Sequence, residues 1–185
     1  MTKPRQSANL SATRSGQQDI SEKVYRDSVH DIVRVNTGSS EGSLVVSLID
    51  APEFQRLRRI RQLGLAYFAY QAAEHSRFTH SLGAFHLAAR MIAKLRVGYD
   101  ISDEHQTVVR VAALLHDIGH GPFSHVIEPI LGFHHEDFTI QALLSSETVV
   151  GRLLHDHSPQ LAEDAASIIR GDFEPFALSQ LVSSQ

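Results

Sequence analysis

The segment HDIGHGPFSH (116–125) directly follows the apolar run VRVAALL (109–115), and it constrains the fold more than any other stretch of the chain. It places three histidines and one aspartate at the end of what the apolar pattern predicts to be a buried helix. Ionisable side chains are costly to bury unless they are paired or bound to a cation. The fold must therefore bring other polar groups, a metal ion, or both to this point.

Helical periodicity dominates the chain beyond residue 50. Apolar residues recur at helical spacing in several segments, and the connections between them are short. Asp50 is predicted to cap a helix that contains Pro52 and Glu53 in its first turn and ends at Gly64. The further predicted helices are 80–96, 102–119, a short one that Pro122 can start and that runs through 126 to 130, 135–145, 147–155, 159–169 and 176–184. Residues 23–35 alternate in polarity and are followed by a loop at 36–42, which is compatible with a small β-hairpin. The fold class predicted is therefore all-α, a helical bundle with a small N-terminal β-hairpin.

Composition limits the chemistry that the chain can use. The chain of 185 residues contains no cysteine, so a metal site must use His, Asp, Glu or water. The polar stretch at 1–20 predicts a disordered tail, and 21–185 then forms one domain. The start lacks the apolar core of a signal peptide, and no apolar run approaches the roughly 20 residues of a membrane span. We therefore expect a cytoplasmic protein that does not bind membranes.

Histidines gather in three short clusters, at 74–81, 116–125 and 133–137. Basic residues dominate 51–100 and acidic residues dominate 101–185, which would suit a site that holds both phosphate and a cation. Ordinary solvated helix faces would give the same charge pattern. Spacing alone leaves a metal site and a set of unrelated surface histidines equally open.

A resemblance to a known family favours the metal site. HSRFTH (75–80) together with HDIGHGPFSH (116–125) resembles the signature of the HD-domain metal-dependent phosphohydrolases, which are named for a His-Asp pair. The longer run LIDAPEFQRLRRIRQLGLAYFAYQAAEHSRFTHSLGAFHLA (48–88) resembles the deoxynucleoside triphosphate triphosphohydrolase branch of that family. The resemblance covers about residues 23–145 and implies an HD-domain helical bundle.

The resemblance implies a divalent metal ion (Mn, Fe, Mg or Zn) held by His80, His116 and Asp117. In the family a fourth ligand, an aspartate, lies in a segment similar to LDADRMDYLLRDS. That segment would follow Gln185, so we expect 21–185 to be a C-terminally truncated HD domain with weak metal binding. The nearest upstream aspartate, Asp172, lies in a setting that does not match.

The same resemblance implies roles for residues that surround the metal. Catalytic roles fall on His125, Glu128 and His135, with Glu128 as the acidic partner of His135. The family more often has Asp where this chain has Glu128. Substrate-binding roles fall on Gln62, Arg77 and His120: Gln62 would contact the sugar 3′-hydroxyl, and Arg77 and His120 would contact phosphate.

The implied reaction is the hydrolysis of a deoxynucleoside triphosphate to deoxynucleoside and triphosphate. Asp50, Gln55 and Arg58 match residues that bind an activating nucleotide between subunits in some members, which implies a homo-oligomer. A helix cap at Asp50 and exposed side chains at the other two positions would explain them equally well. Two alternatives to the implied reaction stay open: a phosphatase or phosphodiesterase of the HD type acting on another nucleotide, and an inactive truncated HD module. Nucleic acid is not an expected partner.

Overall fold

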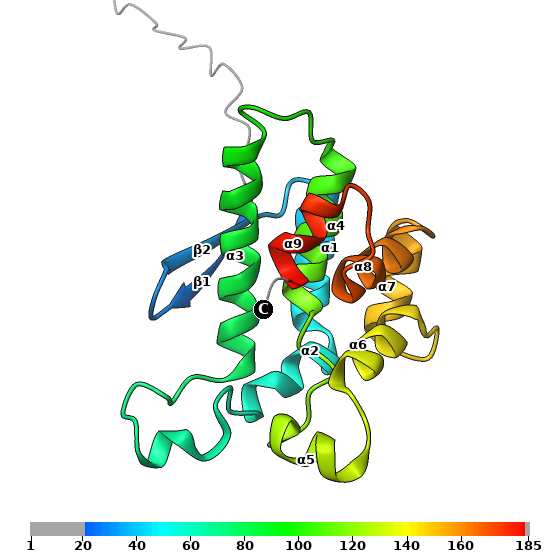
Figure 1. Ribbon diagram of the computed structural model, residues 1–185. Helices are drawn as coiled ribbons and strands as arrows, with labels where there is room; N and C mark the ends of the chain where they lie inside the picture. The colour runs from blue at the N-terminus through cyan, green and yellow to red at the C-terminus, as the bar shows by residue number, and fades with distance from the viewer. Residues whose placement is uncertain (1–20, 184–185) are drawn as a thin grey trace, which may run out of the picture.

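The computed structural model of the chain describes residues 21–183. The predicted N-terminal tail at 1–20 lies outside these described residues, as do residues 184 and 185. Within the described part, strands β1 (Glu22–Asp27) and β2 (Asp31–Asn36) form an antiparallel hairpin in which Tyr25 pairs with Val33. Helices make up most of the remainder (Figure 1), which confirms the predicted fold class.

The described helices follow one another with short connections. In chain order they are α1 (Ser40–Asp50), α2 (Pro52–Gln55), η1 (Arg56–Arg59), η2 (Gly64–Phe68), α3 (Arg77–Leu95), α4 (Asp103–Leu115), α5 (Ser124–Leu131), α6 (His135–Leu144), α7 (Val149–His157), α8 (Leu161–Arg170) and α9 (Phe176–Ser183), where η1 and η2 are short 3-10 helices.

Helix α4 lies at the centre of the bundle. It packs against α3, α8 and α9, while α6 and α7 pack against α8. Its apolar residues from Val108 to Leu115 are buried, including Leu114 and Leu115 at 0% exposure. Ser102 caps this helix by accepting a hydrogen bond from the backbone of His105, as the sequence predicts. No helix within residues 21–183 has the length and apolar character needed to cross a bilayer.

The prediction of one helix that starts at Asp50 and continues to Gly64 is wrong. Asp50 is the last residue of α1, and Ala51 occupies the cap position of α2 without a side-chain hydrogen bond. Because Pro52 disfavours helical geometry in the residue before it, Ala51 is extended, with ψ of 143°, and α1 ends there. Helix α1 itself begins at Ser40, inside the segment that was predicted to be a loop.

Candidate metal centre and active site

The start of α3 and the end of α4 meet at the His-Asp pair 116–117. Arg77 and His80 lie in the first turn of α3, and His116 and Asp117 directly follow the last residue of α4. The two helices pack side by side with opposite directions (Figure 1), so the start of α3 faces the end of α4. The buried apolar face of α4 therefore fixes where the polar side chains gather.

His80, His116 and Asp117 have the arrangement of a metal site. Their candidate ligand atoms all lie within 4.8 Å of one another. The two Nε2 atoms of His80 and His116 are 3.2 Å apart, and Nε2 of His116 is 3.3 Å from Oδ1 of Asp117. Two ligands at right angles around a cation, with bonds of about 2.1 Å, would be separated by about 3 Å. The three side chains therefore fit a divalent ion, as the sequence resemblance implies.

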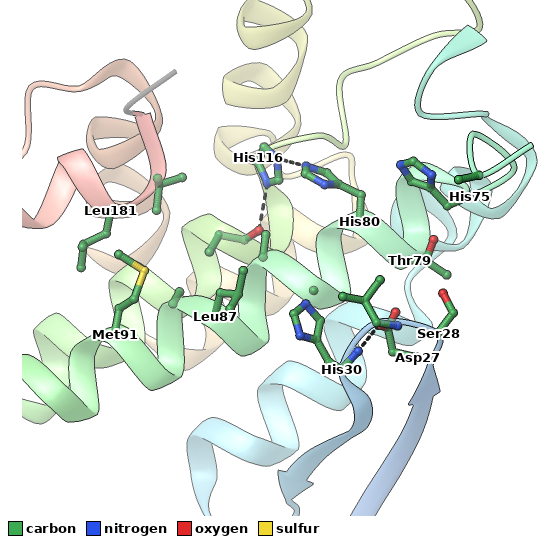
Figure 2. A pocket seen from close by; sticks show the side chains of 17 residues that line it. Asp27, Ser28, His30, His75, Thr79, His80, Leu87, Met91, His116 and Leu181 are labelled. Atoms are coloured by element: carbon green, nitrogen blue, oxygen red, sulfur yellow. Dashed lines mark hydrogen bonds between the residues drawn. The ribbon is translucent and has the colours of Figure 1, made fainter. Parts of the chain in front are cut away.

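The orientation of His116 supports this fit. Its Nδ1 lies 2.9 Å from the carbonyl oxygen of Ala113, within the preceding turn (Figure 2). A carbonyl can only accept, so Nδ1 carries the proton and Nε2 presents a lone pair. Metal-binding histidines are commonly held by such a hydrogen bond.

Asp117 is held as a carboxylate inside the protein. Arg77 donates from Nη1 to Oδ2 of Asp117 at 2.8 Å, and the two side chains are 3% and 5% exposed. Burial by itself raises the pKa of Asp117. The hydrogen bond from His120 and the positive charge of Arg77 outweigh burial and hold this pKa well below its usual range.

A second group of side chains continues from Asp117. Nε2 of His120 lies 3.2 Å from Oδ1 of Asp117, and the His120 ring stacks on that of His135 with centroids 3.6 Å apart. Both carboxylate oxygens of Glu128 lie 3.1 Å from Nδ1 of His135. Burial lowers the pKa of His120 to about 4, against the hydrogen bond to Asp117 that raises it. His120 is therefore neutral near pH 7. This second group also has the geometry of a possible metal site.

The two groups share the wall of a polar cavity of about 290 Å³. Gln62 reaches this cavity through a short β-like pairing of two chain segments: the backbone nitrogen of Gln62 donates to His75 at 3.1 Å, and that of Arg77 donates to Ile60 at 2.9 Å. The structure thus brings together at one cavity eight of the nine side chains predicted for metal, substrate and catalysis, namely Gln62, Arg77, His80, His116, Asp117, His120, His125 and His135. The ninth, Glu128, stands behind His135.

A larger and more apolar cavity of about 550 Å³ opens on the other side of His80 and His116. Figure 2 shows the two imidazoles in its wall, with Leu87 and Met91 of α3 further along. The hairpin turn that contains His30 lines the opposite wall (Figure 2). The paired imidazoles are therefore in contact with two cavities of different character.

Thr139 is a site residue that the sequence did not reveal. Its buried hydroxyl donates to the carbonyl of His116 and accepts from the backbone of Gly119, both at 3.0 Å. Gly119 allows this close approach, because a Cβ at that position would lie 2.1 Å from the carbonyl oxygen of His135. A lone threonine two residues after an acidic pair carries no sequence signal for such a role.

Asp50, Gln55 and Arg58 do not line the polar cavity. Gln55 donates to the carbonyl of Ile49 at 2.6 Å and accepts from Nε of Arg58 at 2.8 Å, and the guanidinium of Arg58 lies 3.5 Å from the Phe78 ring centroid. These contacts stabilise the start of the bundle, and the nucleotide-binding role stays a prediction. Asp172 pairs with Arg170 at 3.3 Å and is likewise absent from the cavity wall.

Comparison with known proteins places this geometry in a family. Residues 77–183 match the model of the HD domain. The chain is 41% identical over 165 residues to the uncharacterized protein YwfO of Bacillus subtilis (strain 168), covering 89% of this chain and 37% of that protein. It is 38% identical over 133 residues to the deoxynucleoside triphosphate triphosphohydrolase SAMHD1 homolog of Dictyostelium discoideum, covering 66% and 25%.

A solved structure is also similar. The crystal structure of a phosphohydrolase from Bacteroides thetaiotaomicron VPI-5482 superposes with a TM-score of 0.73 at 36% identity, covering 88% of this chain and 38% of that one. The chain thus spans between a quarter and about two-fifths of the length of these three proteins. The family match covers more than half of the chain and includes the His-Asp pair at 116–117. The chain belongs to the HD-domain family.

Proposed function

We propose that this domain carries the catalytic centre of a metal-dependent phosphohydrolase that converts a deoxynucleoside triphosphate to deoxynucleoside and triphosphate. The observation that carries the proposal is the convergence of His80, His116 and Asp117 beside the buried Arg77, at the wall of one polar cavity. The similarity to a triphosphohydrolase of Dictyostelium discoideum supports the choice of substrate.

His80, His116 and Asp117 would hold the divalent ion, whether Mn, Fe, Mg or Zn. Such an ion supplies Lewis acidity, which polarises a phosphate oxygen and makes a bound water a better nucleophile near neutral pH. Arg77 fixes the carboxylate of Asp117 with one nitrogen, while its buried Nε has no hydrogen-bond partner among the described residues. Because Arg77 lines the polar cavity, its guanidinium would also donate to a phosphate oxygen of the substrate.

His135 would transfer the proton. Glu128 is ionised, since the hydrogen bond from His135 lowers its pKa against the effect of burial, which raises it. An ionised carboxylate only accepts, so His135 keeps a proton on Nδ1 and uses Nε2 for exchange. In the proposed step a water oxygen bonds to the α-phosphorus and gives up one proton to solvent, the bond from phosphorus to the 5′-oxygen breaks, and His135 protonates that oxygen from Nε2. His125, beside His120 and His135, would stabilise charge on the phosphate.

Gln62 would recognise the sugar. Gln62 lines the cavity, and its buried Oε1 has no hydrogen-bond partner among the described residues. A buried acceptor without a partner is costly unless a ligand donates to it. A sugar hydroxyl has the required donor, which agrees with the role that the sequence resemblance implies.

The identity of the product tests the substrate. Incubation with a deoxynucleoside triphosphate and Mn²⁺ should release triphosphate and deoxynucleoside, resolved by ion-exchange chromatography. Release of orthophosphate or pyrophosphate alone would instead favour a different HD-type phosphohydrolase.

Binding of Mn²⁺ tests the metal site independently of the reaction. Asp117→Asn should lower Mn²⁺ affinity in calorimetric titration by about 10-fold or more, because a charged ligand becomes neutral. Asp172→Asn, which changes an aspartate outside the cavity, is the matched control and should bind as the unchanged protein does. Equal affinity in all three proteins would reject the ligand assignment.

A further inference from the structure

The turn that carries Asp117 is held from two sides by residues far away in the chain. On one side Thr139 of α6 bonds the backbone of His116 and Gly119. On the other side Arg56, the first residue of η1, donates from Nη2 to the carbonyl of Ile118 at 2.6 Å and to that of His120 at 2.7 Å. The carbonyls on either side of Gly119 are thus fixed by a single nitrogen.

The carbonyls of Ile118 and His120 favour a positively charged donor such as the Arg56 guanidinium. They follow the C-terminal end of α4, where carbonyl groups lack partners within the helix and the helix dipole is negative. Arg56 forms no ion pair with a carboxylate of residues 21–183, so its charge is directed at the two backbone oxygens. Hydrogen bonds from a charged donor are stronger than those from a neutral one.

Fixing this backbone also fixes side chains of the metal site. The carbonyl of His120 orients the residue whose Nε2 donates to Oδ1 of Asp117 at 3.2 Å. That same oxygen of Asp117 faces Nε2 of His116 at 3.3 Å. Arg56 is absent from the residues that line the polar cavity, so it acts on this arrangement only through the backbone.

We propose that Arg56 is a positioning residue, which holds the turn 117–120 in the geometry required for cation binding by Asp117. This inference rests on the metal site proposed above. Loss of the tether would let the turn relax, and the carboxylate of Asp117 would have to be reordered each time an ion binds. Outer contacts of this kind typically contribute a factor of about 10 to 100 in metal affinity or activity.

The test compares three variants of the whole chain. Arg56→Gln should weaken Mn²⁺ binding in calorimetric titration by about 10-fold. Arg56→Lys should recover most of the affinity, because one ammonium group can donate to both carbonyls just as the single Nη2 does. Arg59→Gln, an exposed arginine of the same η1 helix, is the matched control and should leave the affinity unchanged.

Two further readouts separate positioning from general stability. In the metal-free protein, NMR signals of the His120 ring should shift in Arg56→Gln and return in Arg56→Lys, while the urea midpoint shows that each variant stays folded. With nucleotide, kcat should fall while KM stays the same, because Arg56 does not contact the cavity.

Unchanged Mn²⁺ affinity in Arg56→Gln, or an equal loss in Arg59→Gln, would overturn the inference. So would a loss in Arg56→Gln that Arg56→Lys fails to reduce. If the unchanged protein binds Mn²⁺ but releases no triphosphate, the proposed substrate is wrong, whereas the comparison of Mn²⁺ affinities still decides the role of Arg56.

Discussion

Glu53 accepts a hydrogen bond at 2.8 Å from the backbone nitrogen of Val149, 96 positions away in the chain, and so adds to the cap that Thr148 gives helix α7. The sequence suggested that Glu53 stabilises the helix in which it lies. Because α2 is only one turn long, the carboxylate of Glu53 instead reaches the N-terminus of α7, where a negative charge is favoured. Glu53 thus connects the first part of the bundle to the last.

Replacing Glu53 should therefore loosen a distant helix. Glu53→Ala is expected to lower the free energy of unfolding by about 1 kcal/mol, because one hydrogen bond at the start of α7 is lost while the cap by Thr148 stays. Hydrogen exchange should accelerate at 149–152 more than within α2. Faster exchange confined to α2 would show that the cap at α7 contributes little.

Arg77→Gln should destabilise the metal-free protein strongly. It leaves the carboxylate of Asp117 buried without its ion partner, which typically costs about 3–5 kcal/mol. Urea denaturation in EDTA measures this, and added Mn²⁺ should restore part of the loss by supplying a positive charge. Arg26→Gln is the control. It removes an ion pair with Asp31 in which the two side chains are 78% and 79% exposed, and it should change the free energy of unfolding little. Similar losses in both variants would contradict the special position of Arg77.

Gly119→Ala should damage the site by crowding. The added methyl would lie 2.4 Å from the backbone nitrogen of Thr139, so α6 would have to move away from the His-Asp turn. We expect a loss of at least about 1–3 kcal/mol together with weaker Mn²⁺ binding. Gly98→Ala, where nothing lies within 4 Å of the new Cβ, is the control and should keep both properties. Normal Mn²⁺ binding by Gly119→Ala would mean that the contact with α6 is dispensable.

Tyr25 should make the fold sensitive to alkali. Burial, followed by the nearby charge of Asp50, raises the pKa of Tyr25 to about 12, and its buried hydroxyl has no partner among the described residues. Because folding raises this pKa, the stability that neutral Tyr25 contributes is complete below pH 10, the pKa of the unfolded state. This stability is lost as the pH rises toward 12. Urea midpoints between pH 9 and 11 should fall more steeply for the unchanged protein than for Tyr25→Phe. If the urea midpoints of the two proteins fell equally with pH, Tyr25 would not be the source of the alkali sensitivity.

Local patterns predicted the helices that bury one continuous face, such as α4 with its cap at Ser102. They failed around Asp50, because Pro52 divides the region into two helices and a 3-10 turn. The sequence resemblance selected the side chains of the polar cavity, since their types and spacing are carried by short motifs. It could not reveal Thr139 or Arg56, whose partners are backbone groups. Such contacts depend on how distant segments pack and leave no pattern of residue types.

The pairing of segment 60–62 with segment 75–77 separates the loop between them from the cavity wall, so the two can change independently in sequence. Backbone hydrogen bonds close the base of the intervening loop, so Gln62 and Arg77 are anchored at its two ends. The loop itself exposes Leu65, Phe68 and Tyr70. Lengthening a surface loop whose ends are already joined costs little free energy. Mutation can therefore reshape residues 63–74 while Gln62 and Arg77 keep their places in the cavity wall.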